Sequence, residues 1–444
     1  MITLYFDDLQ EIRNCFDETE IYDSGMPRIT TSPYANELKH LMVYYQSITR
    51  IDSTMVFDDV IYDINLTDDL QSIKGKYIVP IGVNQSTNEW IGGELAENKT
   101  CKSFINIFDK ISHELLYDLR IGKAFLMIDN SLEGYHDDSV FDFLTHNANA
   151  RDISPNQIIY VTGNLNIENR LKLWTLKNPR KESIHVIPYS HFEFDIGNKK
   201  RIMLENGDST LLNFKQYYEY KKENIDDIKL YNYLNKKPRN HRIFFYDALI
   251  QWDLLNSGLV SMNKANEQED ILLDYNIKTK QELEVLNRNL PTYAYDISNE
   301  VEPFSHYMYN FSVKETLNSW ISVVSETHFG DNQKTIFLSE KTFKAIANEQ
   351  PFVILGNKGS LKELHNYGYK TFHPLIDETY DELGTIDRLN AIIRLLLDFS
   401  NRDNKLEWLH WLGPILKHNS HTLMFNTLFK PPKSFHMIND LLNS

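Results

Sequence analysis

The sequence predicts an α/β protein with two Rossmann-like domains followed by C-terminal helices. The first half alternates short apolar runs, which suit parallel strands buried on both faces, with stretches of helical spacing. A second series of the same alternation runs from about residue 229 to residue 400. Charged and polar residues from Glu223 to Lys229 separate the two series. We therefore expect domains at 1–228 and 229–400, and a helical segment at 401–444.

The first domain is expected to form one doubly wound sheet. Its apolar runs end near polar residues or glycine, as strands do at a sheet edge. Helical patterns at 104–119 and 138–147 lie between them. The predicted strands are Tyr77–Gly82, Ala124–Asp129, Gln157–Thr162 and Ile184–Ile187.

The second domain is expected to begin with the strand Tyr231–Asn235, followed by a basic turn and a helix that runs to about Asn256. Pro238 suits the entrance of that helix, because proline is tolerated in the first turn but not in the interior. Further strands are predicted at Trp320–Val324, Ile336–Leu338 and Pro351–Leu355, and helices at 387–399 and 406–417.

Length and composition indicate a globular protein. The chain has 444 residues, of which 42% are hydrophobic, enough to build full cores. No run of 18 apolar residues occurs, and the segment Met1–Asp8 lacks a basic region and an apolar core. We therefore expect neither a membrane span nor a signal peptide, and we expect a cytoplasmic location, in the host if the protein is viral.

Cys15 and Cys101 lack metal-site spacing and are expected to be structural.

The charge distribution is uneven. The net charge is −16, which argues against nonspecific coating of nucleic acid. Between Arg170 and Arg242, however, 16 Lys and Arg stand against 9 Asp and Glu, so this region carries +7 and the rest carries −23. It is either an ordinary solvated surface or a docking face for a polyanionic acceptor. Its main clusters are 177–181, 199–201, 221–222 and 236–237.

The stretch 336–344 is the strongest candidate for a binding site. Ser339 occupies an N-cap position, so the first-turn N–H groups and the positive end of the helix dipole would face an anion. Lys341 and Lys344 could hold a diphosphate, while Glu340 could accept sugar hydroxyls. The preceding strand ends in a second polar cluster, Ser325–Thr327, at the edge where α/β sheets bind ligands. The alternative is an ordinary capped, amphipathic helix.

The arrangement resembles the donor-site signature of fucosyltransferase-like glycosyltransferases. In that signature an acidic residue follows one strand, Thr-Glu-Lys opens a helix, and a proline-containing strand ends in glycine. Here these features are Glu326, Ser339–Lys341 and Pro351–Gly356, with Ser339 in place of threonine. The resemblance covers roughly residues 230 to 390 and includes bacteriophage and bacterial proteins.

This resemblance implies the GT-B architecture, in which two Rossmann-like domains face a central cleft and a terminal helix returns to the first domain. It implies a nucleoside diphosphate sugar as the donor substrate, and we expect no further cofactor. Arg239 or Arg242 is similar in position to the phosphate-binding arginine of the family. Ser325, Glu326, Ser339, Glu340, Lys341 and Thr342 complete the predicted donor site, with Glu326 and Glu340 expected to hold ribose or sugar hydroxyls.

The catalytic base is expected in the first domain, because single-displacement transfer needs a carboxylate or imidazole beside the acceptor hydroxyl. Asp129 and Glu133 follow the 124–128 strand and are equal candidates; His136 is a weaker third. No metal is expected, since the nearest approach to an Asp-x-Asp motif is Glu193–Asp195, which begins with Glu. P-loop, dinucleotide-binding and hydrolase-elbow motifs are absent from the sequence.

Taken together, the residues and the resemblance predict an inverting, metal-independent glycosyltransferase that uses a nucleotide sugar. The acceptor is either a hydroxymethylated base in viral DNA, docked on region 170–242, or a cell-surface glycan. A non-catalytic nucleotide- or glycan-binding protein of the same fold is the alternative. The sequence leaves open the sugar, the nucleotide, the retaining or inverting outcome and the oligomeric state.

Overall fold

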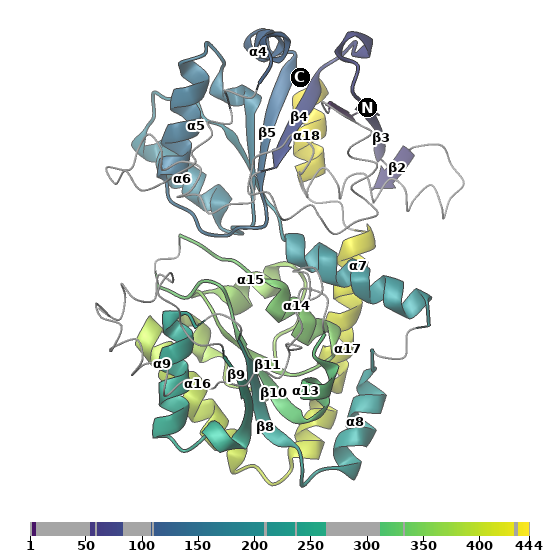
Figure 1. The fold of residues 1–444 in the computed structure, drawn as a ribbon, viewed down its shortest axis with the longest axis vertical. Coiled ribbons are helices and arrows are strands. Elements are labelled where there is room, and N and C mark those ends of the chain that lie inside the picture. Colours follow the sequence, from purple (N-terminus) through teal and green to yellow (C-terminus); the bar gives the residue numbers. More distant parts are fainter. Residues whose placement is uncertain are drawn as a thin grey trace. The chain divides into compact units, whose positions relative to one another are not determined.

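A computed structural model shows a mixed α/β fold with two separate sheets (Figure 1). It describes residues 2–5, 54–57, 60–82, 108, 111–207, 211–235, 238–262, 311–331, 334–429 and 434–443. Cys15, Cys101, Lys236 and Lys237 lie outside the described residues. The chain divides into two compact units: unit 1 takes 1–191, 334–337 and 428–444, and unit 2 takes 192–333 and 338–427.

Unit 1 contains a seven-stranded sheet in the order β2-β3-β1-β4-β5-β6-β7. Only the β2–β3 pair is antiparallel; the other neighbours are parallel. The four strands predicted from apolar runs are β4 to β7, whereas β1 to β3 were not anticipated. The strands are β1 Ile2–Tyr5, β2 Thr54–Phe57, β3 Val60–Thr67, β4 Tyr77–Gly82, β5 Ala124–Asn130, β6 Ile158–Thr162 and β7 His185–Pro188.

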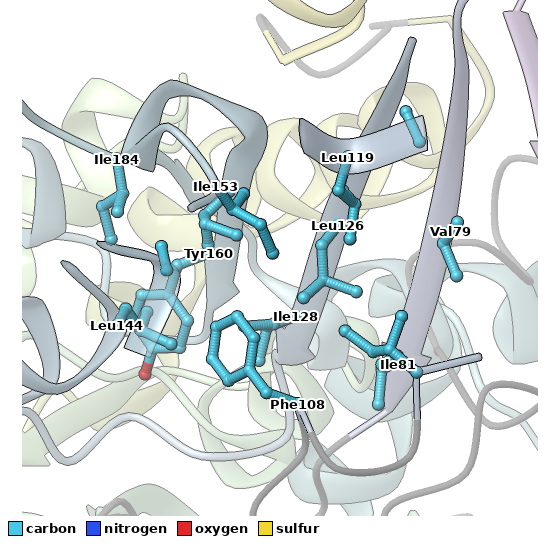
Figure 2. Packing of buried hydrophobic residues seen from close by; sticks show 14 of the residues in the cluster. Val79, Ile81, Phe108, Leu119, Leu126, Ile128, Leu144, Ile153, Tyr160 and Ile184 are labelled. Atoms are coloured by element: carbon cyan, nitrogen blue, oxygen red, sulfur yellow. The ribbon is translucent and has the colours of Figure 1, made fainter. Parts of the chain in front are cut away.

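The core of unit 1 explains why these runs are almost continuously apolar. Every residue of β5 and β6 is buried, as expected for central parallel strands covered on both faces. Side chains from β4, β5 and β6 meet helix residues such as Leu119 and Leu144 in one cluster (Figure 2). Here the sequence pattern and the packing agree.

Helix α4 of unit 1 has an identifiable start signal. The Ser112 hydroxyl accepts a hydrogen bond from Leu115 N at 3.3 Å, which caps α4. The last helix packs against β1, so part of the predicted 401–444 segment does return to unit 1. The helices are η2 Leu70–Ser72, α4 His113–Arg120, α5 Ser139–Asn149, η4 Pro155–Gln157, α6 Ile167–Lys177 and α18 Ser434–Asn443.

Unit 2 contains a four-stranded parallel sheet in the order β11-β10-β8-β9. The strands are β8 Lys229–Leu234, β9 Gly258–Ser261, β10 Ser319–Ser325 and β11 Phe352–Leu355. β8 comes first in the chain, β9 lies on one side of it, and β10 and β11 lie on the other. The direction of strand addition therefore reverses between β8 and β10, which makes this the topological switch point of the sheet.

Most of the described helices belong to unit 2. They are α7 His191–Glu205, which starts at the boundary, α8 Phe214–Glu223, α9 Asn240–Gln251, η5 Leu255–Ser257, α13 Val313–Leu317, α14 Glu340–Ala347, α15 Ser360–Asn366, η6 Thr379–Glu382, α16 Thr385–Ser400 and α17 Lys405–Phe429. The predicted helices at 387–399 and 406–417 are thus α16 and the first part of α17.

The division between the units falls at His191, earlier than the predicted boundary at 228. Two buried lysines explain the difference. Lys200 on α7 donates to Ala347 O and Ser420 Oγ, both at 2.5 Å. Lys221 on α8 donates to Thr316 O and Leu317 O, each at 2.8 Å, and to Ser319 O. Both helices are therefore bound to unit 2, although their basic composition resembled that of a surface.

The prediction of a strand at Ile336–Leu338 was wrong. This segment has no regular secondary structure and pairs with no strand of the described sheets. Instead, Leu165 N donates to Ile336 O at 2.8 Å, and the Asn164 side chain binds the backbone on both sides. The apolar, β-prone composition of the segment reflects this packing within unit 1.

No helix in the described part of the chain is both long enough and apolar enough to cross a lipid bilayer.

Replacing Lys221 with methionine is expected to destabilise the protein strongly. The change keeps much of the side-chain volume but removes the ammonium donor from three backbone carbonyls. Thr316 O and Ser319 O keep a second donor, Gln350 Nε2, at 3.4 and 3.3 Å, and each carbonyl that is left buried and unpaired costs about 1–3 kcal/mol. Lys222→Met, which changes the exposed neighbour on the same helix, is the matched control and should be nearly neutral. Urea unfolding curves of the two variants provide the comparison, and equal midpoints would contradict the role of Lys221.

Candidate functional site

The carboxyl edge of the unit 2 sheet gathers the predicted donor-site residues. Helix α9 begins shortly after β8, and the loop Glu326–Asp331 follows β10, so both lie at the switch point. Ligands of open α/β sheets bind outside the carboxyl ends of strands at such a point. The site can therefore be built from the residues that open α9, follow β10 and open α14.

Ser339 is the N-cap of α14, as predicted, and its hydroxyl accepts a hydrogen bond from Lys341 N at 3.4 Å. The same terminus also receives the carboxylate of Glu326. Its two oxygens accept Ser339 N at 3.0 and 3.1 Å, and Thr342 Oγ1 donates to Oε1 at 2.5 Å. The positive end of α14 thus already holds a negative group from the protein itself.

This geometry changes the roles expected of two predicted residues. Glu326 and Thr342 are fully buried and bound to each other, so they are not positioned to hold donor hydroxyls. The next helix, α15, is filled in the same way, because Asp381 Oδ2 accepts Leu361 N and Lys362 N at 3.1 and 3.2 Å. Within the described residues, two of the three helices that follow strands of this sheet therefore carry an internal carboxylate.

The third of these helices, α9, has a basic N-cap and no side-chain cap among the described contacts. Arg239 occupies the N-cap position and is partly exposed. Arg242, one turn later, is buried, and its Nη2 donates to Ser325 O at 3.2 Å and Glu326 O at 3.3 Å. Arg242 therefore joins α9 to the end of β10, while Arg239 is the arginine that a ligand can reach.

Burial and positive neighbours keep two imidazoles of this cluster neutral. Burial, together with Arg239, Arg242 and Lys341, lowers the pKa of His328 to about 4. Burial followed by the charge of Arg242 holds the pKa of His241 well below its usual value. The pKa of His328 thus responds to Arg239 and Arg242 at the start of α9 and to Lys341 at the start of α14.

Lys341 and Glu340 form an ion pair at the start of α14. Lys341 Nζ lies 2.6 Å from Glu340 Oε1. The Lys341 side chain is 25% exposed and the Glu340 side chain is 21% exposed. Burial alone would raise the pKa of Glu340, but Lys341 and Lys344 outweigh it and lower that pKa to about 2. Glu340 is thus ionised at neutral pH and can accept hydroxyl hydrogen bonds.

Ser325, the last residue of β10, is 2% exposed. Within the described structure its hydroxyl makes no hydrogen bond, which is uncommon for a buried polar group. Of the eight predicted donor-site residues, Arg239, Glu340 and Lys341 are therefore accessible, while Arg242, Ser325, Glu326, Ser339 and Thr342 are buried behind them.

The two predicted bases differ in unit 1. Asp129 is fully buried, and its Oδ1 accepts Ser131 N at 2.9 Å in the turn after β5. Glu133 is partly exposed, and its backbone carbonyl accepts Gly163 N at 3.0 Å. Between these two carboxylates, only Glu133 is open to a substrate hydroxyl.

Residues 334–337 lie against the strand ends next to Glu133. Asn164 Nδ2 donates to Lys334 O at 2.8 Å, and Asn164 Oδ1 accepts Ile336 N at 3.0 Å. A Cβ atom at Gly134 or Gly163 would lie 2.2 Å or 2.7 Å from the Phe337 ring, so only glycine permits this approach. The polar strand end at 162–164 thus binds the chain itself, a role that local sequence could not reveal.

His136 is bound within unit 1. Its Nε2 lies 3.1 Å from Asp138 Oδ1, and Arg170 donates to the same carboxylate. Burial opposes ionisation of Asp138, but His136 and Arg170 hold the pKa of Asp138 well below its usual range. These contacts and its burial make His136 part of a structural ion-pair network.

The basic region 170–242 is less available to a polyanion than its composition suggests. Lys200, Lys221 and Arg242 are buried. Lys181 pairs with Asp142 at 2.9 Å, and Arg201 pairs with Glu205 at 2.6 Å. Several cations of the proposed docking face are therefore buried or already paired with carboxylates of the protein.

The Glu193–Asp195 segment lies on helix α7 and not at a strand end. Glu193 Oε1 accepts the Tyr369 hydroxyl at 2.6 Å inside unit 2. In the part of the chain that the structure describes, no group of three or more His, Cys, Asp or Glu side chains could hold a metal ion.

Glu326→Ala is expected to lower the free energy of unfolding by about 1–3 kcal/mol, because Ser339 N–H and the Thr342 hydroxyl would lose their buried acceptor. Glu326→Gln keeps one acceptor oxygen and the volume, so its loss should be smaller. Thermal or urea unfolding measures the order of the two variants. If alanine were no worse than glutamine, the carboxylate would not be holding the start of α14.

Comparison with known proteins assigns no family to this chain. No protein-family model matches the sequence, and none of the curated proteins matches it. Among solved structures, the N-terminal domain of trehalose-6-phosphate phosphatase from Candida albicans is similar over 92% of this chain and 75% of that chain, with 10% sequence identity and a TM-score of 0.39.

Proposed function

We propose that the protein is an inverting, metal-independent glycosyltransferase that uses a nucleoside diphosphate sugar. The observation that carries the proposal is that the starts of α9 and α14 both bind Glu326 at the end of β10, through Arg242 Nη2 and Ser339 N. Arg239 and Arg242 therefore open one of these helices and Lys341 opens the other, at the switch point of the unit 2 sheet. Three cations beside an uncapped helix terminus suit a diphosphate, whose charge grows as the sugar leaves. Fixed cations at that position can stabilise the leaving group without a metal ion.

The accessible residues receive distinct roles. Arg239 and Lys341 contact the phosphates directly, and Arg242 supports them by holding the end of β10 against α9. Glu340, ionised and partly exposed, accepts a ribose or sugar hydroxyl. The donor position therefore moves from the terminus of α14, which Glu326 fills, to the terminus of α9.

Sugar transfer also needs a base for the acceptor hydroxyl, and we assign this role to Glu133 of unit 1. A carboxylate that is partly exposed can take the proton of an acceptor hydroxyl, whereas Asp129 is enclosed in its turn. This assignment requires the two units to adopt the GT-B arrangement, with the donor and acceptor sites facing one cleft.

Two acceptors are considered for this transferase: DNA with a hydroxymethylated base, and a cell-surface glycan. The buried Lys200 and Lys221 and the paired Lys181 and Arg201 weaken the electrostatic case for DNA. A panel of nucleotide sugars with either acceptor, followed by product mass, separates the cases. Transfer to DNA that falls with added salt would favour the first.

A non-catalytic nucleotide-binding protein is the second candidate, and the internal contacts of Asp129 favour it. If Glu133 were not a base, the donor site would still bind nucleotide but no product would form. Binding without transfer to any acceptor therefore distinguishes this candidate from the enzyme.

Arg239→Ala and Lys341→Ala are each expected to weaken nucleoside diphosphate binding by roughly 10- to 150-fold. The estimate corresponds to one charge-assisted contact of about 1.5–3 kcal/mol. Titration calorimetry with a nucleoside diphosphate measures the change. Lys314→Ala, which removes an exposed lysine before β10 and away from its carboxyl end, is the matched control.

The same titration repeated with a chelator should give unchanged affinity. Loss of binding on chelation, or wild-type affinity in both arginine and lysine variants, would refute the donor site.

Glu133→Gln is expected to keep nucleotide binding and to reduce the transfer rate by about 10²- to 10⁴-fold, because the amide cannot accept the proton. Asp129→Asn should act mainly on stability. Initial rates of sugar transfer, measured beside donor affinity, test the pair. A normal rate in Glu133→Gln would move the base elsewhere.

A further inference from the structure

Arg388 on α16 is a fully buried cation in unit 2 that the proposed reaction does not use directly. Its Nη2 donates to Asp331 Oδ1 at 3.0 Å and Leu383 O at 2.8 Å. Its Nη1 donates to Gly356 O and, at 3.5 Å, to Gly330 O. One guanidinium therefore joins the loop after β10 to the loop after β11.

Arg388 also supports an aromatic ring of the β10 loop. Its Cζ atom lies 5.3 Å from the centroid of Phe329. The Phe329 ring is stacked with His241, with centroids 5.3 Å apart and planes at 24°. Because α16 lies beside α9 (Figure 1), this series of contacts runs from Arg388 to the first turn of α9.

The far end of this series is the candidate anion site. His241 Nε2 lies 3.0 Å from Glu326 O, the carbonyl that Arg242 also contacts. His328 precedes Phe329 and faces the charges of Arg239, Arg242 and Lys341. A displacement of Phe329 would therefore move His328 and release His241 from its stack.

We propose that Arg388 is a positioning residue for this anion site: by holding the loop Thr327–Asp331 against α9, it fixes the cations and imidazoles that a diphosphate meets. The identity of the anion rests on the proposed function, whereas the positioning role does not. Lysine cannot replace Arg388, because a single ammonium lacks the planar fork that serves several acceptors while its face supports an aromatic ring.

The test compares Arg388→Lys with Arg394→Lys, which changes an exposed arginine on the same helix. Affinity for inorganic diphosphate is measured by calorimetry, and His328 is titrated by NMR on protein with selectively labelled histidine. We expect Arg388→Lys to remain folded and to lose about 2- to 30-fold in diphosphate affinity. The pKa of His328 should rise from about 4 toward its ordinary value as the loop loosens, whereas Arg394→Lys should change neither quantity.

A folded Arg388→Lys variant with unchanged diphosphate affinity or an unchanged His328 titration would overturn the positioning role. If the wild-type protein binds no diphosphate, the proposed function fails and the titration alone decides whether Arg388 positions the loop. If Arg388→Lys does not fold, Phe329→Leu takes its place. That variant keeps the hydrogen bonds of Arg388 and removes the stack, so it should show the same rise in the pKa of His328, and no rise would refute the proposal.

Discussion

The contacts of Glu326 hold the candidate site of unit 2 together. Its buried carboxylate binds the first turn of α14, and its backbone carbonyl receives His241 and Arg242 from α9. One residue at the end of β10 therefore joins two helices to the central strands. A buried carboxylate is tolerated here because backbone N–H and hydroxyl donors surround it. Arg242 and the start of α14, which carries Lys341, thus share Glu326 as a common partner.

Two of the three described helices that follow strands of the unit 2 sheet begin at a carboxylate of the protein itself. The carboxylates of Glu326 and Asp381 offset the positive ends of α14 and α15. Helix α9, whose first turn carries Arg239 and Arg242, has no such carboxylate among its described contacts. Among the described contacts, the start of α9 therefore combines two arginines with no capping carboxylate. The place of the proposed anion site is therefore set by the carboxylates that neutralise the starts of α14 and α15.

The sequence predicted the strands better than the connections between them. Apolar runs gave β4 to β7, β8, β10 and β11, because buried parallel strands must be apolar on both faces. Ile336–Leu338 looked like a strand for the same reason, yet its partners are Asn164 and Leu165, which are remote in sequence. Lys200 and Lys221 looked like surface charges, since composition does not show which lysines donate to buried carbonyls.

The candidate site was likewise predictable only in part. A serine before Glu-Lys-Thr correctly indicated a helix start at Ser339. The sequence could not indicate that Glu326, 13 positions away, would occupy that terminus. Arg388 gave no signal either, because a single arginine in an amphipathic helix is ordinary. Such roles arise from tertiary contacts, which local pattern does not encode.

The composition of unit 1 has a consequence for synthesis of the chain. Its sheet is encoded before residue 191, but Asn164 awaits residues 334–336, and β1 awaits α18 near the end of the sequence. During translation neither of these partners exists until residues 192–333 of unit 2 have been made. A fragment ending at 191 would carry an unpaired amide at Asn164 and an uncovered face on β1. Unit 1 is thus completed only after unit 2 has been made.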